Sequence, residues 1–257
     1  MFSVLVVIAI AVVFIAVEKI WPDQKLPQVK GWWWRVILIN AVQAAMVIVG
    51  GMTWEKYFHS INLLHLSEKM SPVAQAFVAY GIMTFVYYWW HRVRHESNTL
   101  WNLLHQLHHS ASRLETITSY YKHPLEIFTN SLIVSGIVYT ICGCSLEAAG
   151  YVNIISSVAE FFYHVNIKTP HWLGYIIQRP EMHKVHHQRG KHYYNFADLP
   201  LWDMAFGTFK NPKEFTAKCG FADNREEKLL EMLIFKNINP GKPHEFKKKL
   251  KKEQEIA

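Results

Sequence analysis

Four stretches of this chain carry no charged side chain over 16 to 21 residues, and this feature restricts the fold more than any other. They are residues 2–17, 36–54, 70–90 and 127–146. A fifth, residues 148–165, is interrupted only by Glu160. An α-helix needs about 20 apolar residues to cross the hydrocarbon core of a bilayer. The sequence therefore predicts an all-α integral membrane helical bundle with four or five spans.

Lys and Arg are distributed unevenly among the connections, and this bias sets the expected orientation. The first loop holds four of them and the second loop two. Segment 91–125 holds four, the hairpin at 143–147 none, and residues 168–257 seventeen. We expect a lumenal or periplasmic N-terminus, with segment 91–125, residues 168–257 and the C-terminus in the cytoplasm. The first stretch lacks a basic segment before it and a small-residue cleavage site, so it is interpreted as a retained anchor of the plasma, inner or endoplasmic reticulum membrane.

Histidine is the second unusual feature, because eight of the fifteen histidines fall in three short windows. Side chains three and four residues apart share one face of a helix, where two imidazoles can reach a common ion. The three windows are His91 with His95, then His105, His108 and His109, then His183, His186 and His187. Because both polar segments lie on one side of the membrane, we expect the windows to meet there in a helical cytosolic cap.

The number and type of these ligands narrow the choice of metal. Imidazole suits zinc, copper, iron and nickel, but a catalytic zinc uses about three protein ligands. The zinc-protease pattern His-Glu-x-x-His is absent, since Thr99 stands where the second histidine would be. Carboxylate-rich di-iron bundles need paired Glu-x-x-His motifs, which are also missing. Two ions sharing eight or more imidazole nitrogens fit a histidine-rich non-haem di-iron centre.

A di-iron centre of this kind is typical of an enzyme, and two other classes of function are compared with that interpretation. A histidine-lined membrane metal transporter or store would need its ligands within the spans, whereas these histidines lie in polar segments at one face. Nucleic-acid binding is suggested only by the pI of about 9.2. The bias of Lys and Arg toward cytoplasmic segments explains that basic balance, so we expect no nucleic-acid partner.

The order of the histidine windows and of the motifs around them resembles the fatty acid hydroxylase/sterol desaturase superfamily over roughly residues 80–212. The motifs are Tyr88-Trp-Trp-His91-Arg, Leu100-Trp-Asn-Leu-Leu-His105-Gln-Leu-His108-His109-Ser110, His123-Pro-Leu-Glu126, Phe162-Tyr-His164-Val-Asn166, Arg179-Pro-Glu-Met-His183 and Trp202-Asp203-Met-Ala-Phe206-Gly207-Thr208. The resemblance implies a membrane enzyme that uses O2 and two iron ions to hydroxylate or desaturate a C–H bond of a lipid.

The resemblance also extends the ligand set. The eight clustered histidines match the ligand motifs, and His164 matches a further histidine of the family, which makes it a ninth predicted ligand. Relatives that hydroxylate sphingolipid acyl chains have a histidine where this chain has Glu160. Glu160 is interpreted as a carboxylate ligand, as an acceptor for an imidazole N–H, or as a residue at the aqueous end of its helix.

Other residues near the motifs receive different roles. His123 precedes a proline, which favours an extended backbone, and it is expected beside the ligands or along the lipid path. His192 is placed outside the ligand set. Asp203 is expected in a structural clasp, where it orients a ligand imidazole.

The sequence divides into 1–70 as anchor spans, 71–212 as the catalytic domain and 213–257 as a basic cytosolic tail. The expected partners are the bilayer, a lipid substrate, O2 and a separate electron-donor protein of the cytochrome, ferredoxin or reductase type. Lysines at 247–249 and 251–252 suit anionic lipid, an acidic electron carrier or simple solvation. Sterol, fatty acyl, alkylglycerol ether and carotenoid substrates all fit, as do hydroxylation and desaturation.

Overall fold

The structure is a computed structural model that describes residues 2–58 and 60–239. Within these ranges the regular structure is helical, and the one β-type pairing is an isolated antiparallel bridge between Gln188 and Cys219. The all-α prediction is therefore confirmed. The long helices are α1 (Phe2–Ile20), α2 (Trp32–Met52), α5 (Pro72–Glu96), α8 (Pro124–Ser135), which continues as the π-helix η3 (Gly136–Ile141), and α9 (Leu146–His164).

In the part of the chain that the structure describes, three segments are long and apolar enough to cross a membrane: Ser3–Ile20, Trp32–Met52 and Pro124–Ile141. They correspond to the first, second and fourth predicted stretches. Helices α5 and α9 are also long, but they are more polar. Helix α5 continues past its apolar part through Arg92 and Arg94, and α9 contains Glu160. Spanning by these two helices remains a prediction.

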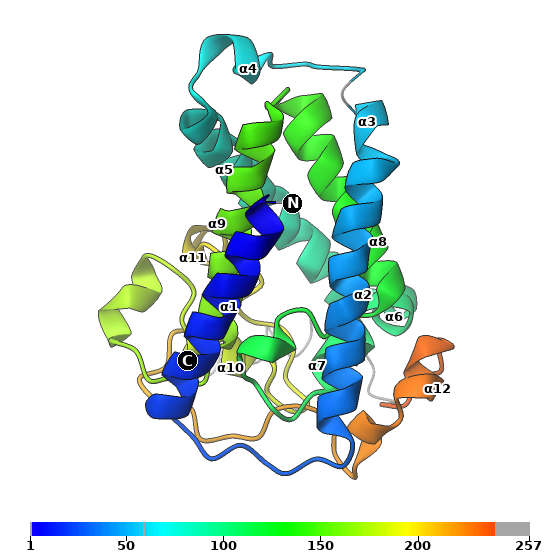
Figure 1. Ribbon diagram of the computed structural model, residues 1–257. Coiled ribbons are helices and arrows are strands. Elements are labelled where there is room, and N and C mark those ends of the chain that lie inside the picture. Colours follow the sequence, from blue (N-terminus) through cyan, green and yellow to red (C-terminus); the bar gives the residue numbers. More distant parts are fainter. Residues whose placement is uncertain (1, 59, 240–257) are drawn as a thin grey trace.

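Helix α9 lies at the centre of the bundle, because α1 and α5 both pack against it while α2 packs against α8 (Figure 1). The core between α5, η3 and α9 is apolar and buried, and includes Met83, Val138 and Val152. By contrast, Leu5 and Val12 of α1 are more than 60% exposed. Such an outward apolar face is the expected surface of a helix in contact with lipid tails.

Local sequence signals explain where several of these helices begin. Helix α5 starts with Ser71 as N-cap followed by Pro72, and the Ser71 hydroxyl accepts a hydrogen bond from Ala74 N–H at 3.4 Å. Helix α9 also starts at a serine N-cap, with the Ser145 hydroxyl accepting a hydrogen bond from Ala148 N–H at 3.2 Å. The tight turn before α9 has Gly143 at φ +63°, a conformation that favours glycine.

Short helices and loops form a cap at one end of the bundle, while α3 and α4 lie at the opposite end (Figure 1). The two at the far end are α3 (Glu55–Phe58) and α4 (Leu66–Lys69). The others are α6 (Asn98–Leu100), η1 (Trp101–His105), α7 (Gln106–Ser110), η2 (Thr116–Thr118), η4 (His171–Tyr175), α10 (Pro180–His186), α11 (Pro200–Ala205), η5 (Arg225–Glu227) and α12 (Leu229–Leu233).

Part of the segment expected to be a basic tail is folded onto this cap. Phe221, Leu229 and Met232 are buried in one apolar core together with Trp32 of α2 and Trp101 of η1. The lysines of the predicted basic cluster at 247–252 lie outside the described residues. The division of the chain at residue 212 remains a prediction.

Candidate metal centre

The three histidine windows and His164 meet at the junction between the long helices and the cap. His91 and His95 occupy the last turns of α5, and His164 is the last residue of α9. The second window lies on η1 and α7, and the third lies on α10 and the residue after it. The two windows that flank the α8–α9 hairpin are in contact, since the rings of His109 and His187 stack with centroids 4.1 Å apart.

All nine predicted ligands fall into two groups, and within each group one nitrogen of every ring lies within 4.8 Å of the others. The first group has five members: His91, His95, His105, His109 and His186. The second group has four: His108, His164, His183 and His187. Eight of these side chains are buried, and His91 is partly buried.

The two His-x-x-His-His motifs are divided between the groups in opposite ways. In the second window, His105 and His109 join the five-histidine group while His108 joins the other. In the third window, His183 and His187 join the four-histidine group while His186 crosses over. Residues four apart on a helix share one face, and the residue between them is rotated away from it. Each motif therefore reaches both groups and ties them together.

Backbone carbonyls orient several of the rings. The Nδ1 of His91 lies 2.8 Å from the carbonyl oxygen of Phe196, and that of His186 lies 2.7 Å from the carbonyl of Tyr194. His164 Nδ1 lies 2.8 Å from the carbonyl of Glu160. A carbonyl oxygen only accepts hydrogen bonds, so each Nδ1–H donates and each Nε2 keeps a free lone pair. Outer hydrogen bonds of this kind typically orient histidines that bind metals.

The inner nitrogens converge at distances suited to a metal ion. Nε2 of His91 is 2.9 Å from Nε2 of His105, and Nε2 of His164 is 3.1 Å from that of His183. Two imidazoles at right angles on one ion, with bonds of about 2.1 Å, would place their nitrogens about 3.0 Å apart. His95 is buried with neither ring nitrogen hydrogen-bonded, which is unfavourable for a polar group unless a cation takes the lone pair. The residues present thus fit two metal ions.

A family comparison agrees with this geometry. The sequence model of the fatty acid hydroxylase family, described as "Fatty acid hydroxylase", matches residues 76–208, which is just over half of the chain. The chain belongs to the fatty acid hydroxylase family. The matched region contains all nine histidines of the two groups, so the predicted resemblance is confirmed.

Several curated relatives are lipid-modifying enzymes. Human alkylglycerol monooxygenase is 32% identical over 136 residues, which cover 51% of this chain and 29% of the relative. A sphingolipid C4-hydroxylase of Schizosaccharomyces pombe is 27% identical, covering 56% of this chain and 51% of the relative. An ornithine lipid hydroxylase of Rhizobium tropici is 28% identical, with 58% and 46% covered. The chain thus spans about half or less of these relatives, and no solved structure matches it significantly.

A buried carboxylate contacts one of the predicted ligands, His105, and sequence reasoning missed this contact. Glu126 Oε1 lies 3.0 Å from Nδ1 of His105 and also pairs with the guanidinium of Arg94. Both charged groups are buried, so each neutralises the other where water is excluded. The signal was available, because Glu126 belongs to the His-Pro-Leu-Glu motif.

The expected clasp is present, but Asp203 binds backbone N–H groups and a hydroxyl instead of a ligand imidazole. The carboxylate of Asp203 accepts hydrogen bonds from Phe196 N–H at 2.8 Å, Ala197 N–H at 3.0 Å and the Thr208 hydroxyl at 2.6 Å. Burial raises the pKa of Asp203 to about 7. Asp203 thereby fixes the loop whose Phe196 carbonyl orients His91. The carbonyls themselves had no sequence signal, since every residue has one.

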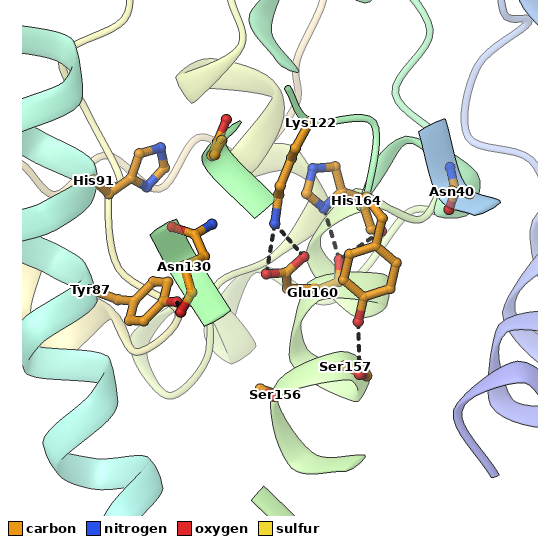
Figure 2. Close-up of polar contacts among 12 residues, drawn as sticks. Asn40, Tyr87, His91, Lys122, Asn130, Ser156, Ser157, Glu160 and His164 are labelled. Carbon is orange, nitrogen blue, oxygen red and sulfur yellow. Dashed lines mark hydrogen bonds and ion pairs between the residues drawn. The ribbon is translucent and has the colours of Figure 1, made fainter. Parts of the chain in front are cut away.

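Glu160 belongs to neither histidine group. Its carboxylate pairs with Lys122, whose Nζ lies 2.8 and 2.9 Å from the two oxygens, as Figure 2 shows. The N–H acceptor for His164 is instead the backbone carbonyl of Glu160. The interpretation of the Glu160 carboxylate as acceptor of an imidazole N–H is therefore wrong, because the carboxylate binds Lys122, and its position at an aqueous helix end stays a prediction.

Two further histidines lie outside the groups. His123 caps α8, because its Nδ1 accepts the Leu125 N–H at 3.0 Å, and its Nε2 lies 3.3 Å from the Leu233 carbonyl. It therefore connects α8 to α12 instead of supporting a ligand. The ring of His192 lies 4.8 Å from that of His109, centroid to centroid, so it borders the five-histidine group.

The histidines of the cap are held in the form that binds metals. Burial lowers the pKa of His186 to about 3, and neighbouring positive charge adds to the effect. Burial and adjacent imidazoles lower the pKa of five more well below the ordinary value: His105, His108, His109, His183 and His187. These rings are neutral near pH 7, and a neutral imidazole is the species that ligates a metal.

Proposed function

We propose that this chain is a membrane-bound, O2-dependent non-haem di-iron oxidoreductase that hydroxylates or desaturates a C–H bond of a lipid. The observation that carries the proposal is the arrangement of nine converging imidazoles in two groups at the end of an apolar helix bundle. The family and the curated relatives support lipid oxidation in particular.

The nine histidines are proposed as the ligands of two iron ions. Iron suits an all-imidazole set, and when bound it would supply O2 activation and the oxidation of an unactivated C–H bond. The five-histidine and four-histidine groups would each hold one ion.

The chain itself keeps the ligands ordered and dry. Carbonyls of Phe196, Tyr194 and Glu160 fix three rings, and Trp101 packs against His95 and His109 with centroids 5.3 and 5.2 Å apart. A rigid, water-poor surrounding strengthens electrostatic interactions at such a site. It also keeps solvent from competing with an apolar substrate.

The overall reaction needs a partner for electrons. Hydroxylation places one oxygen atom of O2 in the C–H bond, and the other leaves as water after taking two electrons and two protons. Desaturation removes two hydrogens, and both oxygen atoms leave as water. We propose a separate cytochrome, ferredoxin or reductase-type donor for both reactions.

The cap is proposed to face the cytoplasm. The count of Lys and Arg favours this side, with residues 1–70 as membrane anchor and 71–212 as the catalytic region. Metal transport is the alternative function. A transporter needs a path with ligands along the spans, whereas eight of the nine histidines lie in the cap or in the last two turns of α5.

Comparative lipidomics of cells with and without the gene, grown under ¹⁸O2, tests the proposal. The expected result is a lipid class that gains one labelled oxygen or loses two hydrogens only when the intact chain is present. Cells that express His108→Ala provide the control, since they keep the protein but lose a proposed ligand. Identical lipidomes with intact, iron-loaded protein and a competent electron donor would contradict the proposal.

A further inference from the structure

An ion pair lies directly beside the two histidine groups, and neither group uses it. Lys122 comes just before α8, and Glu160 lies one turn before the end of α9. Four residues of helix span about 6 Å, so Glu160 lies near the cap end of the bundle, at the depth expected for lipid polar groups. Figure 2 shows the pair between His91 and His164.

The pair is partly accessible, which separates it from a purely internal ion pair. The side chains of Lys122 and Glu160 are 11% and 19% exposed, while those of the buried pair Arg94–Glu126 are 4% and 0%. On a helix predicted to span the membrane, an ionisable pair is unusual and commonly functional. Both side chains therefore keep surface that a small polar group can contact.

Polar side chains continue from the pair along α9 and toward the cap. The hydroxyl of Tyr120 lies 2.7 Å from that of Ser157, one turn before Glu160. Tyr80 donates to Asp198 at 3.4 Å, and burial followed by the charge of Glu160 raises the pKa of Asp198 to about 7. The polar groups around the pair thus combine one ammonium with one or two carboxylates, and their net charge is zero or negative.

We propose that the Lys122–Glu160 pair binds the polar group of the lipid substrate, and that it selects a hydrogen-bond donor without net negative charge, such as an ammonium or a hydroxyl. This inference rests on the proposed function, because that function is what makes the bound lipid a substrate. The Glu160 carboxylate has acceptor positions beyond those used by Lys122. An incoming carboxylate would meet Glu160 and Asp198 against a single Lys, and it would be repelled.

The test measures binding to chelator-treated, full-length protein in a neutral detergent, so that it does not depend on turnover. The probes are a long-chain primary amine, the alcohol and the fatty acid of the same chain length. The wild type should bind the amine and alcohol more tightly than the carboxylate. In Glu160→Gln the Lys122 ammonium is left uncompensated, and the preference of amine over carboxylate should fall by about tenfold or reverse.

Two further variants separate recognition from structure. Lys122→Met removes the cation. It should therefore weaken carboxylate binding further and raise the ratio of amine affinity to carboxylate affinity. Glu214→Gln is the matched control, because Glu214 pairs with Lys168 at 3.0 Å on the exposed surface of the cap, and the ratio should not change. A variant that merely loosens the fold would weaken all three probes equally.

Two results would overturn the inference: wild-type protein that binds the carboxylate as tightly as the amine, or ratios that stay the same in Glu160→Gln and Lys122→Met. Iron content, measured on the same preparations before chelation, distinguishes this failure from failure of the proposed function. Iron loading with unaltered probe ratios would refute only the polar-group site. Missing iron with altered ratios would refute only the oxygenase.

Discussion

The ability of each histidine in this site to bind a metal depends on which of its ring nitrogens points toward the other histidines of its group. Sequence spacing predicted eight histidines, and the family resemblance added His164. Neither revealed that a main-chain carbonyl fixes the ring, because the carbonyls of Tyr194 and Phe196 come from a loop whose path depends on long-range packing. Glu126 was visible in a motif, but its contact with His105 depends on the placement of α8 beside η1.

Replacing one histidine from each group should remove metal selectively. We expect His186→Ala and His108→Ala each to lose about one of two irons and to lose turnover, because each belongs to a different group. Elemental analysis of purified variants measures the loss. His65→Ala is the control, since His65 is exposed at the far end of the bundle next to α4. Full iron and activity in both ligand variants would contradict the site.

Glu126→Gln should weaken iron binding without removing a ligand. The amide cannot neutralise Arg94, and it holds Nδ1 of His105 less strongly than a carboxylate does. We expect iron affinity to fall about 10- to 100-fold, as is typical when an outer partner of a metal-binding histidine is changed. Competition with a chelator measures this affinity, and Glu214→Gln should leave it unchanged. Equal affinity in Glu126→Gln and wild type would refute the supporting role.

Whole elements bring these side chains together, and one irregular helix positions the predicted ligand His105. Residues Trp101–His105 form the π-helix η1, which ends on His105 as α7 begins. Short π-helical segments within α-helices are frequent at functional sites. The predicted apolar stretches located the long helices well, because composition alone identifies them. The short cap helices lack a clear period, so only the histidine motifs indicated them.

A strap at residues 218–221 holds two ligand-bearing elements together, outside the region expected to be catalytic. Phe221 N–H donates to the Ser110 carbonyl at 3.1 Å, and Gly220 N–H donates to the His187 carbonyl at 3.3 Å. Gly220 has φ +71°, and a Cβ there would lie 2.5 to 2.7 Å from the backbone of Ala111 and Ser112. Because backbone atoms cannot swing away, the strap requires glycine.

Gly220→Ala should therefore destabilise the cap and lower iron content. Gly190→Ala is a matched control, since Gly190 has φ +75° but open space around its Cβ position. We expect about 1–2 kcal/mol of destabilisation in Gly190→Ala from the backbone conformation alone. The destabilisation of Gly220→Ala should be larger than this value, because the added Cβ also clashes with backbone atoms. Thermal unfolding and iron analysis compare the two, and equal stability would refute the clash.

At the scale of the whole molecule, the bundle and the cap enclose many neutral imidazoles. Their pairing across the α8–α9 hairpin was predictable, since the topology expected from the sequence put both windows on one side of the membrane. The division into groups of five and four was not, because it depends on the rotation of α7 and α10 relative to each other. The participation of residues 218–238 in the cap was also missed, because the tail was inferred from residues 213–257 as a whole, where 11 Lys and Arg outnumber 8 Asp and Glu.

The pH dependence of stability should reflect these buried rings. The cap histidines have pKa values below the unfolded value of about 6.5. Unfolded chains therefore take up protons that the folded chain does not, so metal-free protein should lose stability as the pH falls below about 6.5. Thermal unfolding of chelated protein across this range measures the trend. Stability that rises on acidification would contradict neutral, buried histidines.

The central claim is that nine imidazoles hold two iron ions at the junction of bundle and cap. Iron quantification of the anaerobically purified, iron-loaded full chain, combined with X-ray absorption at the iron edge, tests it most directly. We predict about two irons per chain, each with a first shell dominated by imidazole nitrogen. Protein that stays folded yet binds less than about one iron per chain, or binds iron mainly through oxygen ligands, would contradict the claim.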